Sequence, residues 1–103
     1  EMNLSEIPAL SGALDTLQQG IISSLHKDNS VLARDIYNSE AFLKDPKFDL
    51  LFDPQTSGGL LASVPIEEAE NCLKKLHRLG RADATSIGRI SKVNAALPAI
   101  ILR

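Results

Sequence analysis

The sequence has little of three features, and each scarcity excludes a class of protein. It contains one cysteine, so no disulfide can form within the chain, which suits a reducing compartment. No apolar run approaches the ~20 residues that span a bilayer. The first residues lack the basic and then apolar order of a secretory signal. We therefore expect a cytoplasmic protein that has no membrane segment.

The chain also carries little net charge. A formal charge of −2 gives no electrostatic steering toward nucleic acid or an anionic membrane, so we expect neither as a partner. Apolar residues make up 44% and charged residues 23%, which is typical of a soluble globular protein. A length of 103 residues suffices for one small domain. Because the chain begins with Glu1 rather than Met, we interpret residues 1–103 as one partial domain of a longer protein.

Two segments have the pattern of helices. Residues 11–19 repeat apolar side chains at helical spacing, with Ser11 as a possible N-cap and Gly20 just past the end. Residues 65–79 place acidic side chains in the first turn and basic ones in the last, which complements the helix dipole, and Gly80 follows. Ala69, Leu73 and Leu76 form the expected buried stripe of this helix.

Other segments have the pattern of strands. The predicted strands are residues 59–64, a buried central strand, then 85–93 and 99–102. Residues 21–30 resemble a loop, 31–43 are ambiguous, 48–52 form a short apolar run, and 94–97 form a connection. Strands separated by helices indicate an α+β fold, in which helices pack on a mixed β-sheet. The pattern leaves open whether the strands are parallel or antiparallel.

The most informative segment is a polar corner between two apolar runs, which reads Asp-Pro-Gln-Thr-Ser-Gly-Gly-Leu-Leu from Asp53 to Leu61. Its Asp, Thr and Ser side chains can bind nearby backbone, and its two glycines permit positive φ and close approach by another group. No lysine follows the glycines, so the segment is not a Walker A loop. Its chemistry leaves two readings open, a structural turn or a loop that binds an anion.

As a string of residues, Asp53 to Leu61 resembles the signature of the C-terminal domain of selenophosphate synthetases (selenide, water dikinases). Residues 7–14 are similar to that family's Ile-Pro-x-Leu-x-Gly-Ala stretch, and Asn29 stands where the family tends to carry an asparagine. Residues 82–89 also fit the family's closing portion. The resemblance covers nearly the whole chain in the right order.

The resemblance implies a fold and a reaction. The family belongs with aminoimidazole ribonucleotide synthetase, in which an N-terminal ATP-binding domain forms the dimer and a C-terminal α+β domain closes over the site. Selenophosphate synthetases are kinases that convert selenide, ATP and water into selenophosphate, AMP and phosphate, using magnesium. The expected partners are therefore the chain's own N-terminal domain, a second copy of the parent, and the substrates selenide and ATP.

The resemblance also indicates what this chain lacks. The family's nucleophilic cysteine or selenocysteine and its lysine lie in an N-terminal loop, and its magnesium-binding aspartates lie mostly in the N-terminal domain. A further aspartate lies in an Asp-Val-Thr-Gly-Phe-Gly stretch that opens the C-terminal domain, which suggests truncation at the N-terminal side. None of these motifs occurs here, so we expect residues 1–103 alone to be inactive, with no catalytic residue, metal ligand or bound cofactor.

The expected substrate- or phosphate-binding residues are those of the corner. Hydroxyls and backbone N–H groups can hold a phosphate without a formal charge. We expect Cys72 to be a buried structural residue, and His26 and His77 lack the spacing of metal ligands. Two alternatives remain: another ATP-using synthetase of the superfamily, or a non-catalytic binding module with this fold. The expected site residues are Asp53, Thr56, Ser57, Gly58 and Gly59.

Overall fold

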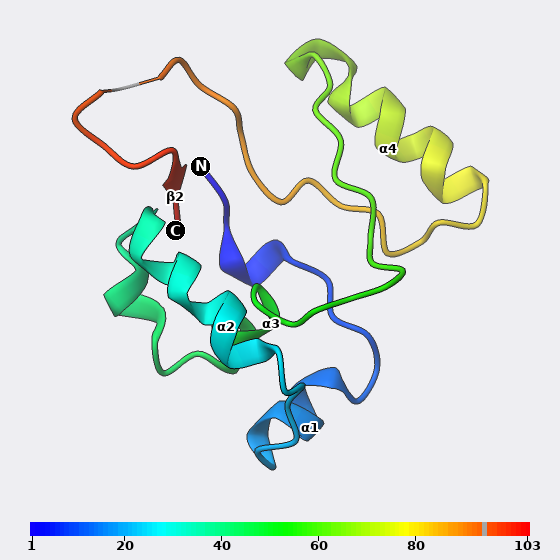
Figure 1. Ribbon diagram of the computed structural model, residues 1–103. Coiled ribbons are helices and arrows are strands. Elements are labelled where there is room, and N and C mark those ends of the chain that lie inside the picture. The colour runs from blue at the N-terminus through cyan, green and yellow to red at the C-terminus, as the bar shows by residue number, and fades with distance from the viewer. Residues whose placement is uncertain (94) are drawn as a thin grey trace.

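The computed structural model describes residues 1–93 and 95–103 (Figure 1). Helices and a small parallel sheet together make the chain α+β, as expected. No helix among these residues is long and apolar enough to cross a membrane. The elements are η1 (Leu4–Glu6), α1 (Ala13–Gln18), α2 (His26–Ser30), η2 (Val31–Asp35), β1 (Ile36–Tyr37), η3 (Ser39–Phe42), α3 (Pro46–Leu50), η4 (Ile66–Glu68), α4 (Ala69–Arg78) and β2 (Ile100–Ile101), where η marks a 3-10 helix.

The sheet joins segments from both ends of the sequence. β1 and β2 pair in parallel, with Ile36 opposite Ile100. Met2 extends this pairing, because it bridges Leu102 in parallel and Gly88 in the antiparallel sense. The strand predicted over residues 99–102 is therefore confirmed, and the pairing around Met2 contains both strand directions. The two termini lie side by side as a result (Figure 1).

The hydrophobic core is small, and its side chains come from η1, from the sheet region, and from α3 and the residues directly after it. Two of them, Leu4 and Leu102, are each only 1% exposed. The rings of Phe48 and Phe52 meet edge to face, with centroids 5.1 Å apart. Burial of one such side chain contributes roughly 1.5–3 kcal/mol, so each member matters in a core of this size. The buried apolar residues are Leu4, Ile36, Phe48, Phe52 and Leu102.

The helix predicted over residues 11–19 is present as α1, with one correction at its start. Its N-cap is Gly12, at φ 82°, rather than Ser11. Gly20 has φ 73°, the left-handed conformation expected just past a helix end. The loop predicted over residues 21–30 is correct for residues 21–25 and wrong for residues 26–30, which form α2. The residues of α2 are polar, and the helix is a single turn that continues directly into η2. It therefore lacks the apolar periodicity by which a helix is predicted.

The ambiguous stretch of residues 31–43 resolves into η2, β1 and η3, with a break at Asn38, which has φ 68°. The short apolar run that follows begins inside a helix, α3. Asp45 caps α3 by accepting a hydrogen bond from the Lys47 N–H at 2.9 Å, and Pro46 occupies the first turn. This helix turns Phe48 into the core.

The helix predicted over residues 65–79 is present as η4 followed directly by α4. Glu70 and Lys74 form the ion pair expected one turn apart, at 2.5 Å, and Gly80 has φ 81° just past the end. The apolar side chains of this helix, expected to be buried, are less buried than predicted. Leu73 and Leu76 are only half-buried, because α4 lies apart from the core (Figure 1).

Two predicted strands are wrong. In the part of the chain that the structure describes, residues 59–64 pair with no strand, and Leu60 and Leu61 are 95% and 73% exposed. Residues 85–93 form no continuous strand, and only Gly88 makes a bridge. An apolar pattern favours a strand, but a strand also needs a backbone partner, and none of the described residues provides one for 59–64. Within the predicted connection, Asn94 lies outside the described residues, and 95–97 turn the chain.

Candidate functional site

The corner of residues 53–59 connects α3 to the extended segment that leads to α4 (Figure 1). Its first residue, Asp53, is half-buried beside the core. Thr56, Ser57, Gly58 and Gly59 are all exposed. The structure therefore places the expected site residues on one continuous, outward-facing loop.

The hydroxyls of this loop are available to a ligand. Within residues 1–93 and 95–103, neither Thr56 nor Ser57 makes a side-chain hydrogen bond, and the Asp53 carboxylate caps no backbone N–H. A corner that served only as a turn would be expected to use such side chains on its own backbone. This loop does not, which leaves its donors and acceptors free.

The two glycines have ordinary backbone angles. Among the described glycines, positive φ occurs at Gly12, Gly20 and Gly80, and at neither Gly58 nor Gly59. A Cβ at Gly58 would meet Oε1 of the flexible Gln55 side chain at 2.7 Å, and a Cβ at Gly59 would meet no atom within 4 Å. These glycines therefore do not serve the turn geometry. Gly59 leaves open space over its backbone, whereas the space over Gly58 is shared with the flexible Gln55 side chain.

The start of the corner is held by the core. The Phe52 ring is 4% exposed, and its carbonyl oxygen accepts a hydrogen bond from Nδ2 of Asn29 at 3.0 Å. Asn29 lies on α2, a helix that the sequence pattern did not predict. The resemblance had singled out Asn29 as a residue, but it offered no structural role for it.

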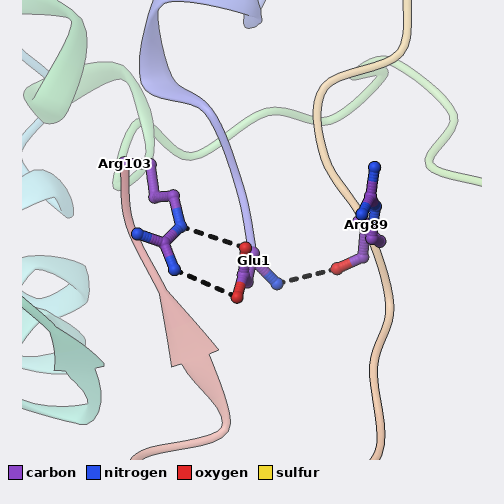
Figure 2. Close-up of polar contacts among 3 residues, drawn as sticks. All are labelled: Glu1, Arg89 and Arg103. Atoms are coloured by element: carbon purple, nitrogen blue, oxygen red, sulfur yellow. Dashed lines mark hydrogen bonds and ion pairs between the residues drawn. The ribbon is translucent and has the colours of Figure 1, made fainter.

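A second polar cluster lies where the termini meet, and it lines an open hollow of about 390 Å³. Figure 2 shows the Arg103 guanidinium donating to both carboxylate oxygens of Glu1, at 3.0 and 3.1 Å. These hydrogen bonds lower the pKa of the Glu1 carboxyl and raise that of Arg103. The Glu1 nitrogen donates to the Arg89 carbonyl at 2.8 Å. The Arg103 guanidinium and the Glu1 carboxylate are paired with each other, so we interpret the cluster as a structural contact between the two ends of the chain.

The hollows and the corner do not coincide. A second hollow, of about 330 Å³, lies between α1 and the start of α3, where Leu17, Asp45 and Asp49 contribute to its lining. Neither hollow includes a residue of 53–59.

The remaining reactive side chains have structural surroundings. Cys72 is half-buried in α4, less than the expected full burial. His26 is 7% exposed, and its Nε2 lies 3.5 Å from Oδ1 of Asp49. Nε2 of His77 lies 2.7 Å from the Ala84 carbonyl, a contact that joins α4 to the segment after it. In the described part of the chain, no three His, Cys, Asp or Glu side chains are grouped as metal ligands would be.

Comparison with known proteins identifies a sequence relationship. The chain is 35% identical over 94 residues to the selenide, water dikinase of Clostridioides difficile strain 630. It is 33% identical over 101 residues to that of Caldanaerobacter subterraneus subsp. tengcongensis. The chain is a relative of the selenide, water dikinases. These matches cover 87% and 89% of the chain. No family model matches, and no solved structure matches.

The chain is much shorter than these relatives. It spans about a quarter of their length, 26% in both cases. A third relative, the selenide, water dikinase of Clostridium botulinum strain Alaska E43, is 38% identical over 70% of the chain and 21% of its own length. The chain therefore corresponds to a part of each selenide, water dikinase.

Proposed function

We propose that this chain is the C-terminal part of a selenophosphate synthetase, with the C-terminal domain fold of the aminoimidazole ribonucleotide synthetase superfamily. In this proposal the parent enzyme converts selenide, ATP and water into selenophosphate, AMP and phosphate in the cytoplasm. It acts as a homodimer whose N-terminal domains bind ATP, and residues 1–103 form one partial domain that is inactive by itself. Two findings support this assignment: the relatives are named selenide, water dikinase, and the chain spans only about a quarter of their length.

The observation that carries the proposal is the position of the Asp53-to-Leu61 string. The residues that resemble the family's signature form an exposed loop whose hydroxyls have no partner in the described chain. In the proposed role, Thr56 and Ser57 donate O–H groups, and Gly58 and Gly59 donate backbone N–H groups, to phosphate oxygens of the substrate. Such donors stabilise negative charge without a cation of their own. Asp53, at the half-buried start of the loop, completes the proposed set of substrate- or phosphate-binding residues.

The parent's magnesium ion has no fitting site among the described residues. Magnesium is usually held by one or two carboxylates together with water and substrate phosphates. Asp53 is the sole carboxylate of the corner, and the described chain groups no three potential ligands together. We therefore assign no magnesium ligand and no magnesium-dependent step to this chain.

The test uses the full-length protein. Phosphorus NMR would follow ATP, AMP and selenophosphate in the presence of selenide, for the native protein and for Ser57→Ala and Gly58→Ala. Loss of a hydrogen bond to a charged phosphate is expected to lower kcat/KM roughly tenfold to a hundredfold. Gly58→Ala is informative because the structure accommodates its methyl group by a shift of the Gln55 side chain alone.

The matched control for Ser57→Ala is Ser24→Ala, which removes an exposed hydroxyl from a different loop. Normal activity of Ser24→Ala beside a large loss in Ser57→Ala would support the corner as the site. Equal rates for both variants would make the corner a structural turn. A native protein that formed ADP with a different acceptor would overturn the assignment to selenium chemistry.

A further inference from the structure

Asn29 lies at the point where the corner leaves the core. Its side-chain amide reaches from α2 to a residue 23 positions later, and Nδ2 donates to the Phe52 carbonyl at 3.0 Å. The contact is partly buried. A long-range hydrogen bond from a side chain to a backbone carbonyl, partly shielded from water, restricts the orientation of that carbonyl.

Restricting this carbonyl also restricts the loop that follows it. The peptide unit is planar, so the Phe52 C=O and the Asp53 N–H turn together. The Asp53 N–H points back to the Leu50 carbonyl at 3.3 Å. The next residue, Pro54, locks its own φ and restricts Asp53 to an extended conformation. The direction in which residues 55–59 leave the core is therefore set at Phe52.

The rest of Phe52 is also held by contacts. Its ring meets Phe48 edge to face at 5.1 Å and His26 at 6.3 Å, and its N–H donates to the Asp49 carbonyl at 3.1 Å. Its carbonyl is held by Asn29. Beyond Asp53, by contrast, no hydrogen bond within the described chain holds residues 56–59. The corner thus depends on a single anchored end.

We propose that Asn29 is a positioning residue for the substrate-binding corner. It does not touch substrate; it orients the Phe52–Asp53 peptide plane, and through it the hydroxyl and N–H donors of residues 56–59. This inference rests on the proposed function of the corner. It adds a residue from α2, outside the signature string, to the set that determines how well a phosphate-bearing substrate is bound.

The kinetic test compares three variants of the full-length protein. Asn29→Ala removes the donor, and Asn29→Asp keeps the shape but sets a carboxylate oxygen against the Phe52 carbonyl. The matched control is Ser30→Ala, which deletes a hydrogen bond that stays within α2, from Ser30 Oγ to the Lys27 carbonyl at 2.8 Å. Both Asn29 variants are expected to raise KM for ATP about threefold to tenfold with kcat nearly unchanged, and Ser30→Ala is expected to leave both constants alone.

A raised KM with an unchanged kcat distinguishes a positioning role of Asn29 from simple destabilisation of the fold. A variant that only lowered the folded fraction would reduce the apparent kcat and leave KM unchanged. Unchanged KM in the Asn29 variants, or an equal change in Ser30→Ala, would overturn the proposal.

A second readout does not depend on turnover. In full-length protein labelled with 15N-glycine, the amide signals of Gly58 and Gly59 should shift in both Asn29 variants and stay in place in Ser30→Ala. The signal of Gly80, at the end of α4, serves as the internal reference. If the native protein makes no selenophosphate, the proposed function fails, and the glycine shifts alone then decide the role of Asn29. Signals that do not move would refute it.

Discussion

The backbone at Gly88 lies so close to the N-terminal segment that it has no room for a side chain. A Cβ built on Gly88 would press against the Glu1 carbonyl oxygen and would lie 3.0 Å from the Met2 Cα. Both are main-chain atoms, which cannot rotate away as a side chain can. Gly88→Ala should therefore separate the N-terminal segment from residues 87–89.

The cost follows from the hydrogen bonds that join the two segments. Three backbone hydrogen bonds, each 2.8 Å long, link Glu1 to Arg89 in both directions and Asn3 to Ile87. At about 0.5–1 kcal/mol each, net of the hydrogen bonds that water makes at this exposed edge, their loss would cost about 1.5–3 kcal/mol. The alanine also reduces the entropy of the unfolded chain, worth about 0.4–1 kcal/mol in the opposite sense. The net loss should be about 1–2 kcal/mol.

Urea unfolding followed by circular dichroism would measure this loss. With a typical slope of about 1–1.5 kcal/mol per molar for a chain of this size, the midpoint should fall by about 1 M. The matched control is Gly59→Ala, because a methyl group there meets no atom within 4 Å and φ is ordinary. It should change stability by less than about 0.5 kcal/mol. A Gly88→Ala midpoint equal to that of Gly59→Ala would refute the predicted clash.

Two further predictions concern the core and the contact between the chain ends. Leu102→Ala should cost about 2–4 kcal/mol in urea unfolding, since Leu102 is 1% exposed, whereas Val93→Ala should cost less than about 0.5 kcal/mol because Val93 is 97% exposed. Arg103 holds the pKa of the Glu1 carboxyl in the folded chain below its value in the unfolded chain. The ion pair therefore stabilises the folded chain at pH values above the unfolded pKa, and this stabilisation is lost as the pH falls through the folded pKa. Glu1→Gln should therefore reduce the loss of thermal stability between about pH 6 and about pH 3, and an unchanged acid profile would contradict this.

Helices with strong local signals were predictable. α4 appears where acidic residues, basic residues and Gly80 indicated it, because dipole pairing, the Glu70–Lys74 ion pair and the terminal glycine all act within a few residues. α2 was missed because it is one turn of mostly polar residues. It stands where His26 packs on the Phe52 ring and Asn29 holds the Phe52 carbonyl, contacts that span more than twenty positions.

Strands were predicted less well, and the reason is physical. Residues 59–64 have the composition of a buried strand, but burial and pairing depend on what lies opposite, and in the described chain nothing does. Met2 and Leu4, which alternate around Asn3, carry a short strand-like pattern of only three residues. They take part in the pairing and the core because Gly88 and Leu102 come to lie on either side of Met2.

The family relationship and the string that forms the corner could be identified from the residues alone, because a nine-residue string is specific regardless of its conformation. The sequence also predicted α1 and α4, whose capping and ion pairing are local. The outward position of the corner, its free hydroxyls and the hydrogen bond from Asn29 to the carbonyl before it became visible only in the folded chain. Those properties arise from contacts between residues far apart in sequence, and the periodicity of a single segment carries no information about its distant neighbours.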